Sequence, residues 1–229
     1  MEMQFATIWE AISDHIPNDP ALICGEDIVT WKEYEERAAK LAFFLNEQSI
    51  GNNSKVGLYL HNSNEYLEAQ FATFKVEGVP INVNYRYVEE ELIYLLDNSD
   101  SEIVFFQSTY GERIKKIADK LPKIKAYIQV GGENSLDIDN CFLYEEIISR
   151  NPLLKRKVRS EDNIYMLYTG GTTGMPKGVM YKQGGFMNSL LKTAFAMGFD
   201  VPESHMDIPL RVSELSSKKM LSKTIVACP

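Results

Sequence analysis

Residues 164–178 read Ile-Tyr-Met-Leu-Tyr-Thr-Gly-Gly-Thr-Thr-Gly-Met-Pro-Lys-Gly, from Ile164 to Gly178. The first five residues form an apolar run that predicts a strand. The ten that follow contain four glycines, three threonines and one lysine. Glycine lets the backbone approach a ligand closely, and consecutive N–H groups can then point at one anion. Hydroxyl groups and the compact ammonium of Lys177 suit the same ligand, so we predict a polyphosphate-binding loop over 169–178.

The loop matches neither of two common nucleotide-binding patterns. A Walker A loop has Gly directly before the Lys and Ser or Thr directly after it, whereas Pro176 and Gly178 flank Lys177. The Rossmann fingerprint G-x-G-x-x-G does not fit residues 170–174 either. A plain turn between two strands is the structural alternative, but such a turn needs only about two to five residues and no lysine.

Upstream of the loop, short apolar runs alternate with helical patterns. We predict strands over 56–60, 79–83, 103–106 and 124–130, and helices over 65–76, 89–96 and 110–121. Alternation of this kind indicates an α/β fold with a mostly parallel sheet and helices on both faces.

The flanking segments extend this prediction. Apolar residues at helical spacing predict a helix over 5–16, and Gly25-Glu26-Asp27 predicts a small hairpin between 21–24 and 28–30. Thr30-Trp31-Lys32-Glu33 has the pattern of a capping box that opens another helix. Beyond the loop we predict a strand over 179–181, a helix over 186–197 and a strand over 224–228. The chain is thus divided into an α/β part (1–130), a loop and basic linker (131–163) and a phosphate-loop part with the start of a second sheet (164–229).

Composition excludes several classes of function. The 229 residues contain 24 Lys and Arg against 32 Asp and Glu, giving a net charge of −8, which argues against a nucleic-acid binder. The three cysteines form no CxxC pair and suit a reducing compartment. Neither a secretory signal nor a membrane-spanning apolar run is visible. We therefore expect a cytoplasmic protein without a membrane segment.

The stretch Tyr168–Gly178 resembles the phosphate-loop signature of the adenylate-forming superfamily, which holds acyl-CoA synthetases, firefly luciferase and peptide-synthetase adenylation domains. Two weaker elements of that family stand upstream in the same order. Residues 29–34, Val-Thr-Trp-Lys-Glu-Tyr, resemble its "LTYxEL" element, and residues 74–86, from Phe74 to Arg86, resemble its "LKAGAVxVPLNPR" element. The residues of this last element and of the phosphate loop are most similar to those of bacterial fatty-acyl-CoA synthetases.

The resemblance implies a two-step reaction. A carboxylic acid, here a fatty acid, attacks the α-phosphate of Mg·ATP to give an acyl-adenylate and pyrophosphate, and coenzyme A then displaces AMP to form a thioester. The resemblance implies roles for the loop residues. Hydroxyl groups would contact phosphate or Mg²⁺, with Thr169 nearest the metal, backbone donors would come from the glycines, and Lys177 would be the catalytic group that pairs with the leaving phosphates. The implied binding set is Thr169, Gly170, Gly171, Thr172, Thr173, Gly174, Lys177 and Gly178.

Family members are commonly more than twice this length. Their later acidic motif, ribose-binding aspartate and small C-terminal domain have no counterpart here, and residues 224–229 resemble the strand that leads into a His-containing motif. We expect the chain to be the N-terminal portion of such an enzyme, inactive by itself. Alternatives are a truncated, non-catalytic nucleotide-binding remnant, an enzyme that loads a carrier protein instead of coenzyme A, and a kinase, which the failed Walker match disfavours.

Other features favour structural interpretations. His15, His61 and His205 have no metal-ligand spacing, and we assign them structural or surface roles. The basic cluster of the linker, Lys155, Arg156, Lys157 and Arg159, is expected to be a solvated stretch rather than an anion site.

Overall fold

The computed structural model describes residues 3–169, 176–196 and 206–217. The strand predicted over 224–228 lies outside these residues. The helices are α1 (Phe5–His15), α2 (Trp31–Glu47), α3 (Asn64–Lys75), α4 (Glu89–Asn98), α5 (Gly111–Ile117), α6 (Tyr144–Arg150), α7 (Gln183–Ala196) and α8 (Asp207–Ser217). The strands are β1 (Pro20–Cys24), β2 (Asp27–Thr30), β3 (Lys55–Tyr59), β4 (Val79–Asn82), β5 (Ser101–Gln107), β6 (Ala126–Val130), β7 (Cys141–Leu143), β8 (Ile164–Thr169) and β9 (Lys177–Lys182).

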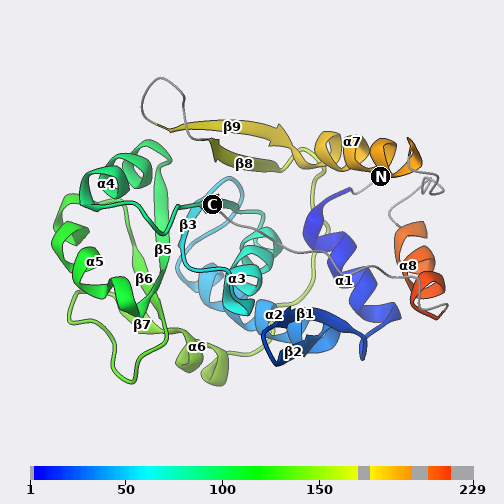
Figure 1. Ribbon diagram of the computed structural model, residues 1–229, viewed down its shortest axis with the longest axis horizontal. Coiled ribbons are helices and arrows are strands. Elements are labelled where there is room, and N and C mark those ends of the chain that lie inside the picture. The colour runs from blue at the N-terminus through cyan, green and yellow to red at the C-terminus, as the bar shows by residue number, and fades with distance from the viewer. Residues whose placement is uncertain (1–2, 170–175, 197–205, 218–229) are drawn as a thin grey trace.

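A five-stranded parallel sheet in the order β4-β3-β5-β6-β7 forms the centre of the molecule (Figure 1). Helices α2, α3 and α6 cover one face, and α4 and α5 cover the other. The predicted α/β class with a parallel sheet and helices on both faces is confirmed. Strand β7 and helix α6 were not predicted, and both fall within the expected loop and linker region 131–163.

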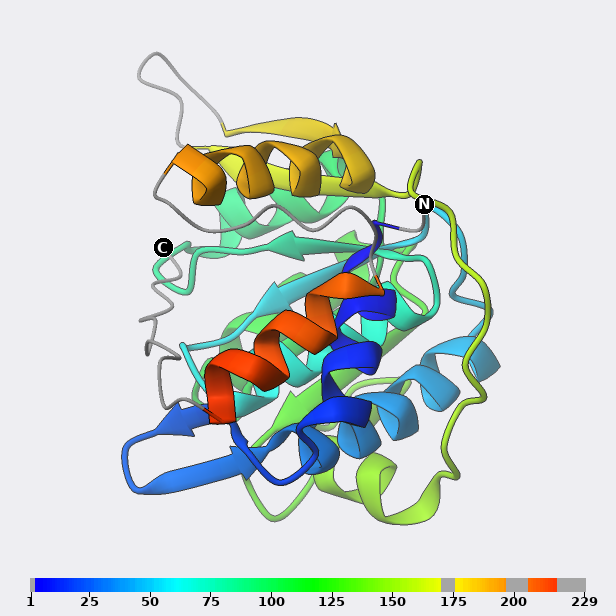
Figure 2. The same cartoon turned by 90° about the vertical axis from the view of Figure 1, so that its right-hand side faces the viewer.

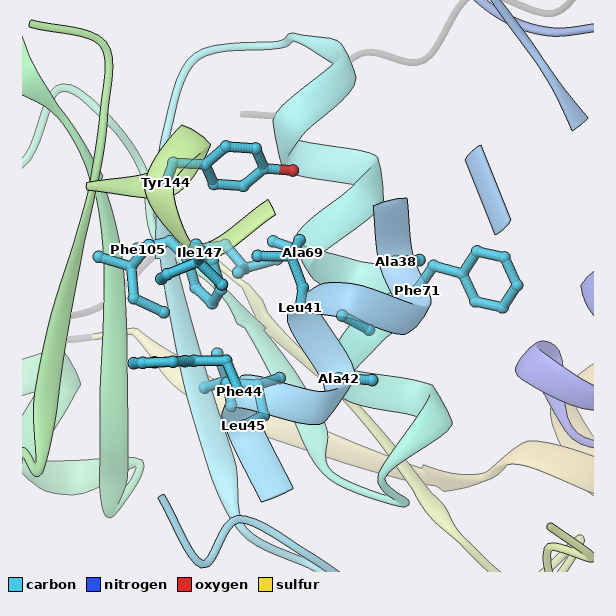
Figure 3. Close-up of a cluster of buried hydrophobic side chains, with 14 of the residues drawn as sticks. Ala38, Leu41, Ala42, Phe44, Leu45, Ala69, Phe71, Phe105, Tyr144 and Ile147 are labelled. Atoms are coloured by element: carbon cyan, nitrogen blue, oxygen red, sulfur yellow. The ribbon is translucent and has the colours of Figure 1, made fainter. Parts of the chain in front are cut away.

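The two faces of the sheet bury separate cores because side chains alternate along each strand. Phe105 of β5 points into the cluster formed with α2, α3 and α6, while its neighbour Phe106 points into the cluster formed with α4 and α5. Both rings are fully buried. Figure 3 shows the first cluster, in which Leu41 and Phe44 of α2 and Ala69 of α3 surround Phe105.

The local signals at the start of the chain form as predicted. Strands β1 and β2 pair antiparallel around Gly25, whose φ of +64° suits a residue without a Cβ. The Thr30 hydroxyl accepts a hydrogen bond from the Glu33 N–H at 3.3 Å, and the Glu33 carboxylate accepts one from the Thr30 N–H at 2.9 Å. This capping box starts α2 at Trp31.

The β8–β9 hairpin and α7 form a layer along the β4 edge of the sheet, as Figures 1 and 2 show. Helix α8 packs against α1, where Ile208 and Val212 cover Ile8 and Ile12. The hairpin is therefore a separate two-stranded sheet beside the parallel one.

Candidate functional site

The predicted phosphate loop joins two antiparallel strands, β8 and β9. Thr169, the last residue of β8, is paired in register with Lys177, the first residue of β9. Both residues are exposed. Because paired residues of an antiparallel ladder lie next to each other, the two ends of the loop bring one hydroxyl and one ammonium group to the same end of the hairpin.

Five of the eight predicted binding residues lie outside the described residues: Gly170, Gly171, Thr172, Thr173 and Gly174. Thr169, Lys177 and Gly178 are described. Within the described part of the chain, the Lys177 ammonium has neither an ion pair nor a hydrogen bond. Its ammonium group is therefore not engaged by any described protein group and is available to a ligand.

Gly178 packs against the side chains of β8. A Cβ built on Gly178 would lie 3.0 Å from Tyr168 Cε2 and 3.0 Å from Met166 Sδ. Glycine at this position therefore lets β9 lie close to the Tyr168 ring. This packing gives Gly178 a structural reason to be glycine, in addition to the binding role predicted for it.

The end of β8 is held by the parallel sheet and by α4. The Tyr168 N–H donates to Asn82 Oδ1 of β4 at 3.1 Å, and the Tyr168 hydroxyl donates to Asn98 Oδ1 at the end of α4 at 2.9 Å. Burial raises the pKa of Tyr168, with a further contribution from Tyr94, so the hydroxyl stays a donor at neutral pH. On the other side of the loop, the Tyr94 hydroxyl donates to the Pro176 carbonyl at 3.4 Å.

A second polar cluster lies at the carboxyl ends of β3 and β5. The chain leaves β3 toward β4 and leaves β5 toward β6, in opposite directions. Ligands of open α/β sheets bind at such a switch point. His61 Nε2 lies 2.5 Å from the Tyr110 hydroxyl, and Arg113 donates to the Tyr59 hydroxyl at 2.5 Å.

His61 was expected to have a structural or surface role, and Arg113 was expected to lie on a solvated helix face with the other basic residues of 113–125. Arg113 is instead only partly exposed and donates to the Tyr59 hydroxyl and to the Tyr87 carbonyl, while Tyr59 and Tyr110 were not singled out. Burial raises the pKa of Tyr59, and the hydrogen bond from Arg113 opposes this increase. The order of the strands in the sheet brings these residues together. That order cannot be predicted from the residues near each position in the sequence. The available signal was the position of His61 directly after the predicted strand 56–60 and of Tyr110 shortly after the predicted strand 103–106.

A family match covers most of the chain, from α1 to α8. The family described as "AMP-binding enzyme" matches residues 9–210, which span both the parallel sheet and the β8–β9 hairpin. The chain belongs to the AMP-binding enzyme family.

Relatives of the chain include acyl-CoA ligases. It is 39% identical over 187 residues to a 3-oxocholest-4-en-26-oate–CoA ligase from Rhodococcus rhodochrous, covering 80% of this chain and 33% of the relative. It is 38% identical over 205 residues to a medium/long-chain-fatty-acid–CoA/3-oxocholest-4-en-26-oate–CoA ligase from Mycobacterium marinum, covering 86% and 37% of the two chains. The chain thus spans about a third of the length of these relatives.

Solved structures share the fold of the chain. A long-chain-fatty-acid–CoA ligase from Archaeoglobus fulgidus superposes with a TM-score of 0.73 at 24% identity, covering 87% of this chain and 41% of that chain. An anthranilate–CoA ligase in complex with anthranoyl-AMP gives a TM-score of 0.71 at 19% identity, covering 78% and 35%. These similarities confirm the expected fold.

The described residues contain neither a cluster of metal ligands nor a helix that could span a membrane. Among residues 3–169, 176–196 and 206–217, no three His, Cys, Asp or Glu side chains lie together as ligands for a metal ion. In the same part of the chain, every helix is too short or too polar to cross a bilayer.

Proposed function

We propose that the chain provides the ATP-phosphate site of an enzyme that activates a fatty acid as an acyl-adenylate and transfers it to coenzyme A. The observation that carries the proposal is the pairing of Thr169 with Lys177 at one end of the β8–β9 hairpin. The loop between them has the family's glycine- and threonine-rich sequence. The ligase names of the relatives support the choice of reaction.

In the proposed reaction, the chain positions the phosphates and stabilises charge. As the acid attacks the α-phosphate, negative charge grows on the departing pyrophosphate. The Lys177 ammonium, free of protein partners among the described residues, would stabilise that charge by a charge-assisted hydrogen bond. The same contact would bind the phosphates of ATP before the reaction, and it would lower the barrier because it becomes stronger as the negative charge grows.

The residues present fit a magnesium ion that is bound through the nucleotide. Mg²⁺ prefers oxygen ligands and keeps substrate phosphates and waters in its shell, so it needs few protein ligands. The exposed Thr169 hydroxyl, beside the predicted phosphate site, would be such a ligand. The ion would neutralise phosphate charge. The absence of a carboxylate cluster among the described residues does not conflict with this mode of binding.

The nature of the acid and of the acyl acceptor rests on the relatives alone. Their names include both fatty acids and a steroid carboxylic acid, and both are large apolar carboxylates that are joined to coenzyme A. We infer a substrate of that class for the whole enzyme. Transfer to a carrier-protein thiol is the second candidate. The chain is also 29% identical over 185 residues to tyrocidine synthase 3 from Brevibacillus parabrevis.

Product analysis tests the proposal. The chain is incubated with Mg²⁺, ATP labelled at the α-phosphate, a fatty acid and either coenzyme A or a phosphopantetheine carrier. Labelled AMP supports adenylation, and the thiol that becomes acylated identifies the acceptor. Labelled ADP would indicate phosphoryl transfer and contradict the proposal. ATP binding without any product agrees with a chain that supplies only the phosphate site and is inactive by itself, whereas absence of ATP binding would contradict the proposal.

A further inference from the structure

A buried cluster of charges joins three helices to the segment that precedes β8. Lys75 at the end of α3 donates to Glu10 of α1 at 2.6 Å and to Glu35 of α2 at 2.7 Å. Arg159 donates to both carboxylate oxygens of Glu10, at 2.8 and 2.9 Å, and its Nε donates to the Lys75 carbonyl at 3.0 Å. The side chains of Lys75 and Arg159 are each only 1% exposed.

This finding corrects the expectation that the basic cluster of the linker is solvated. Arg159 is buried, Arg156 donates to Glu35 at 3.2 Å and to Asp14 at 2.7 Å, and Lys157 pairs with Glu77. Lys155, Arg156 and Lys157 are exposed as expected, although Arg156 and Lys157 also make ion pairs, so the expectation fails for Arg159. It failed there because Glu10, the partner of Arg159, lies on a helix far away in the sequence.

Residues 151–163, here called the strap, contain neither helix nor strand. Its Val158 side chain is 79% exposed, directly beside the buried Arg159. Earlier in the strap, the Leu154 N–H donates to the Ala39 carbonyl of α2 at 3.1 Å. Basic side chains therefore provide much of the attachment between the strap and the helices.

Helix α1 is bonded to the chain on both sides of the base of the β8–β9 hairpin, just before β8 and just after β9. Glu10 holds Arg159 shortly before β8 begins, and the Phe5 N–H donates at 3.1 Å to Gln183 Oε1 where β9 leads into α7. The Gln183 N–H donates to the Asn163 carbonyl at 2.8 Å and closes the base of the hairpin. The end of the hairpin opposite the phosphate loop is thus held by one helix.

The geometry points to Arg159 as a positioning residue for the phosphate loop: through its bidentate bond to Glu10 it fixes β8, and so the place at which Thr169 and Lys177 present their side chains. What the loop binds rests on the proposed function. The attachment of the hairpin rests only on the contacts described above.

The chemistry of the cluster favours positioning over simple stabilisation. Buried ion pairs are often no more stabilising than apolar residues of the same volume, so their presence is weak evidence for a role in stability alone. A guanidinium fork bound to both oxygens of a carboxylate is strongly directional. The cluster contains two buried positive groups and two buried negative groups. Each of these four charges therefore has a partner of opposite sign.

The test compares Arg159→Lys with the unmodified 229-residue chain. Lysine keeps the buried positive charge but loses the fork and the bond to the Lys75 carbonyl. Hydrogen exchange is measured at the amides of β8 and β9 and at those of β3 and β5. We expect at least about tenfold faster exchange in β8 and β9, equivalent to about 1.4 kcal/mol of local stability, with β3 and β5 unchanged.

Two further variants control the experiment. Arg150→Lys makes the same substitution at an exposed residue next to the strap, where Arg150 pairs with Glu146 at 3.0 Å, and should change no amide. Glu10→Gln weakens the same bond from its other side and should reproduce the local pattern. The double variant with Arg159→Lys should be less severe than the sum of the two single ones, because both remove one interaction.

Uniformly faster exchange in all four strands, or unchanged exchange in β8 and β9, would overturn the inference. Mg·ATP binding supplies the second arm. A higher Kd for Arg159→Lys together with the local pattern supports positioning of the loop, whereas the local pattern with an unchanged Kd overturns it. If the unmodified chain does not bind Mg·ATP, the proposed function fails, and the exchange data still decide whether Arg159 positions the hairpin.

Discussion

Individual residues of the hairpin have roles that residue type alone does not reveal. Gly178 belongs to the predicted phosphate-binding set, yet its Cα faces the Tyr168 ring and Met166. Arg159 was expected in a solvated cluster, and it is buried against Glu10. In both cases the decisive neighbour lies on another element, so the pattern of residues around each position could not show it.

Gly178→Ala should lower the free energy of unfolding by about 1–3 kcal/mol, because the new methyl group would crowd the Tyr168 ring. Gly185→Ala is the matched control, since a Cβ there meets no atom within 4 Å. Its effect should range from neutral to about 1 kcal/mol stabilising, because Gly185 lies in α7. Urea denaturation measures both. Equal effects for the two variants would contradict the packing role of Gly178.

The carboxylate of Glu10 makes stability depend on pH. Burial by itself would raise the pKa of Glu10, but the hydrogen bond from Arg159 and the charges of Lys75 and Arg159 lower it overall from 4.5. A carboxyl group whose pKa is lowered in the folded state stabilises the fold above its ordinary pKa, and this contribution is lost as the pH falls through the folded-state value. The advantage of the unmodified chain over Glu10→Gln should therefore shrink below pH 4.5.

Glu68→Gln provides the opposite case. Urea denaturation at a series of pH values measures both Glu10→Gln and Glu68→Gln. Burial raises the pKa of Glu68 despite the nearby charge of Arg37. A raised carboxyl pKa means that the folded state binds the proton more tightly, so stability increases as the pH falls through that window. Relative to Glu68→Gln, the unmodified chain should gain stability as the pH falls toward 4.5, whereas relative to Glu10→Gln it should lose stability only below pH 4.5. Parallel trends for the two variants would contradict this account of the two carboxylates.

At the scale of elements, local signals predict where several helices and strands begin. The capping box at Thr30 is one case, because both of its hydrogen bonds join residues three positions apart. Thr30→Ala should cost about 1 kcal/mol of stability by leaving the N-terminus of α2 without its side-chain cap. Thermal denaturation of this variant and of Thr30→Ser, which keeps the hydroxyl, measures the effect. An equal loss of Tm in both variants would show that the cap is not its cause.

Elements without a local signal were not predicted. Strand β7 is only Cys141–Leu143, and it is a strand because it pairs with β6 at the edge of the sheet. Helix α6 follows it directly and covers the same core through Ile147 and Ile148. Such short elements depend on tertiary contacts, which outweigh their weak propensities.

At the scale of the whole molecule, the alternation of apolar runs was sufficient to predict a parallel sheet covered on both faces. It could not give the strand order β4-β3-β5-β6-β7, which brings Tyr59, Tyr110 and Arg113 together. It also could not show how the phosphate-loop hairpin is attached. That attachment depends on Glu10 and Arg159, which are 149 positions apart in the sequence.

The central claim is that the end of the β8–β9 hairpin binds the phosphates of ATP through Lys177. Calorimetric titration of Mg·ATP into the unmodified chain, Lys177→Ala and Lys182→Ala tests it most directly. Lys182 is the matched control, because it is an exposed lysine at the other end of β9 that pairs with Asp162. Loss of a charge-assisted hydrogen bond costs about 1.5–3 kcal/mol, so Lys177→Ala should raise the Kd at least about tenfold and Lys182→Ala should leave it unchanged. An unchanged Kd for Lys177→Ala would contradict the account.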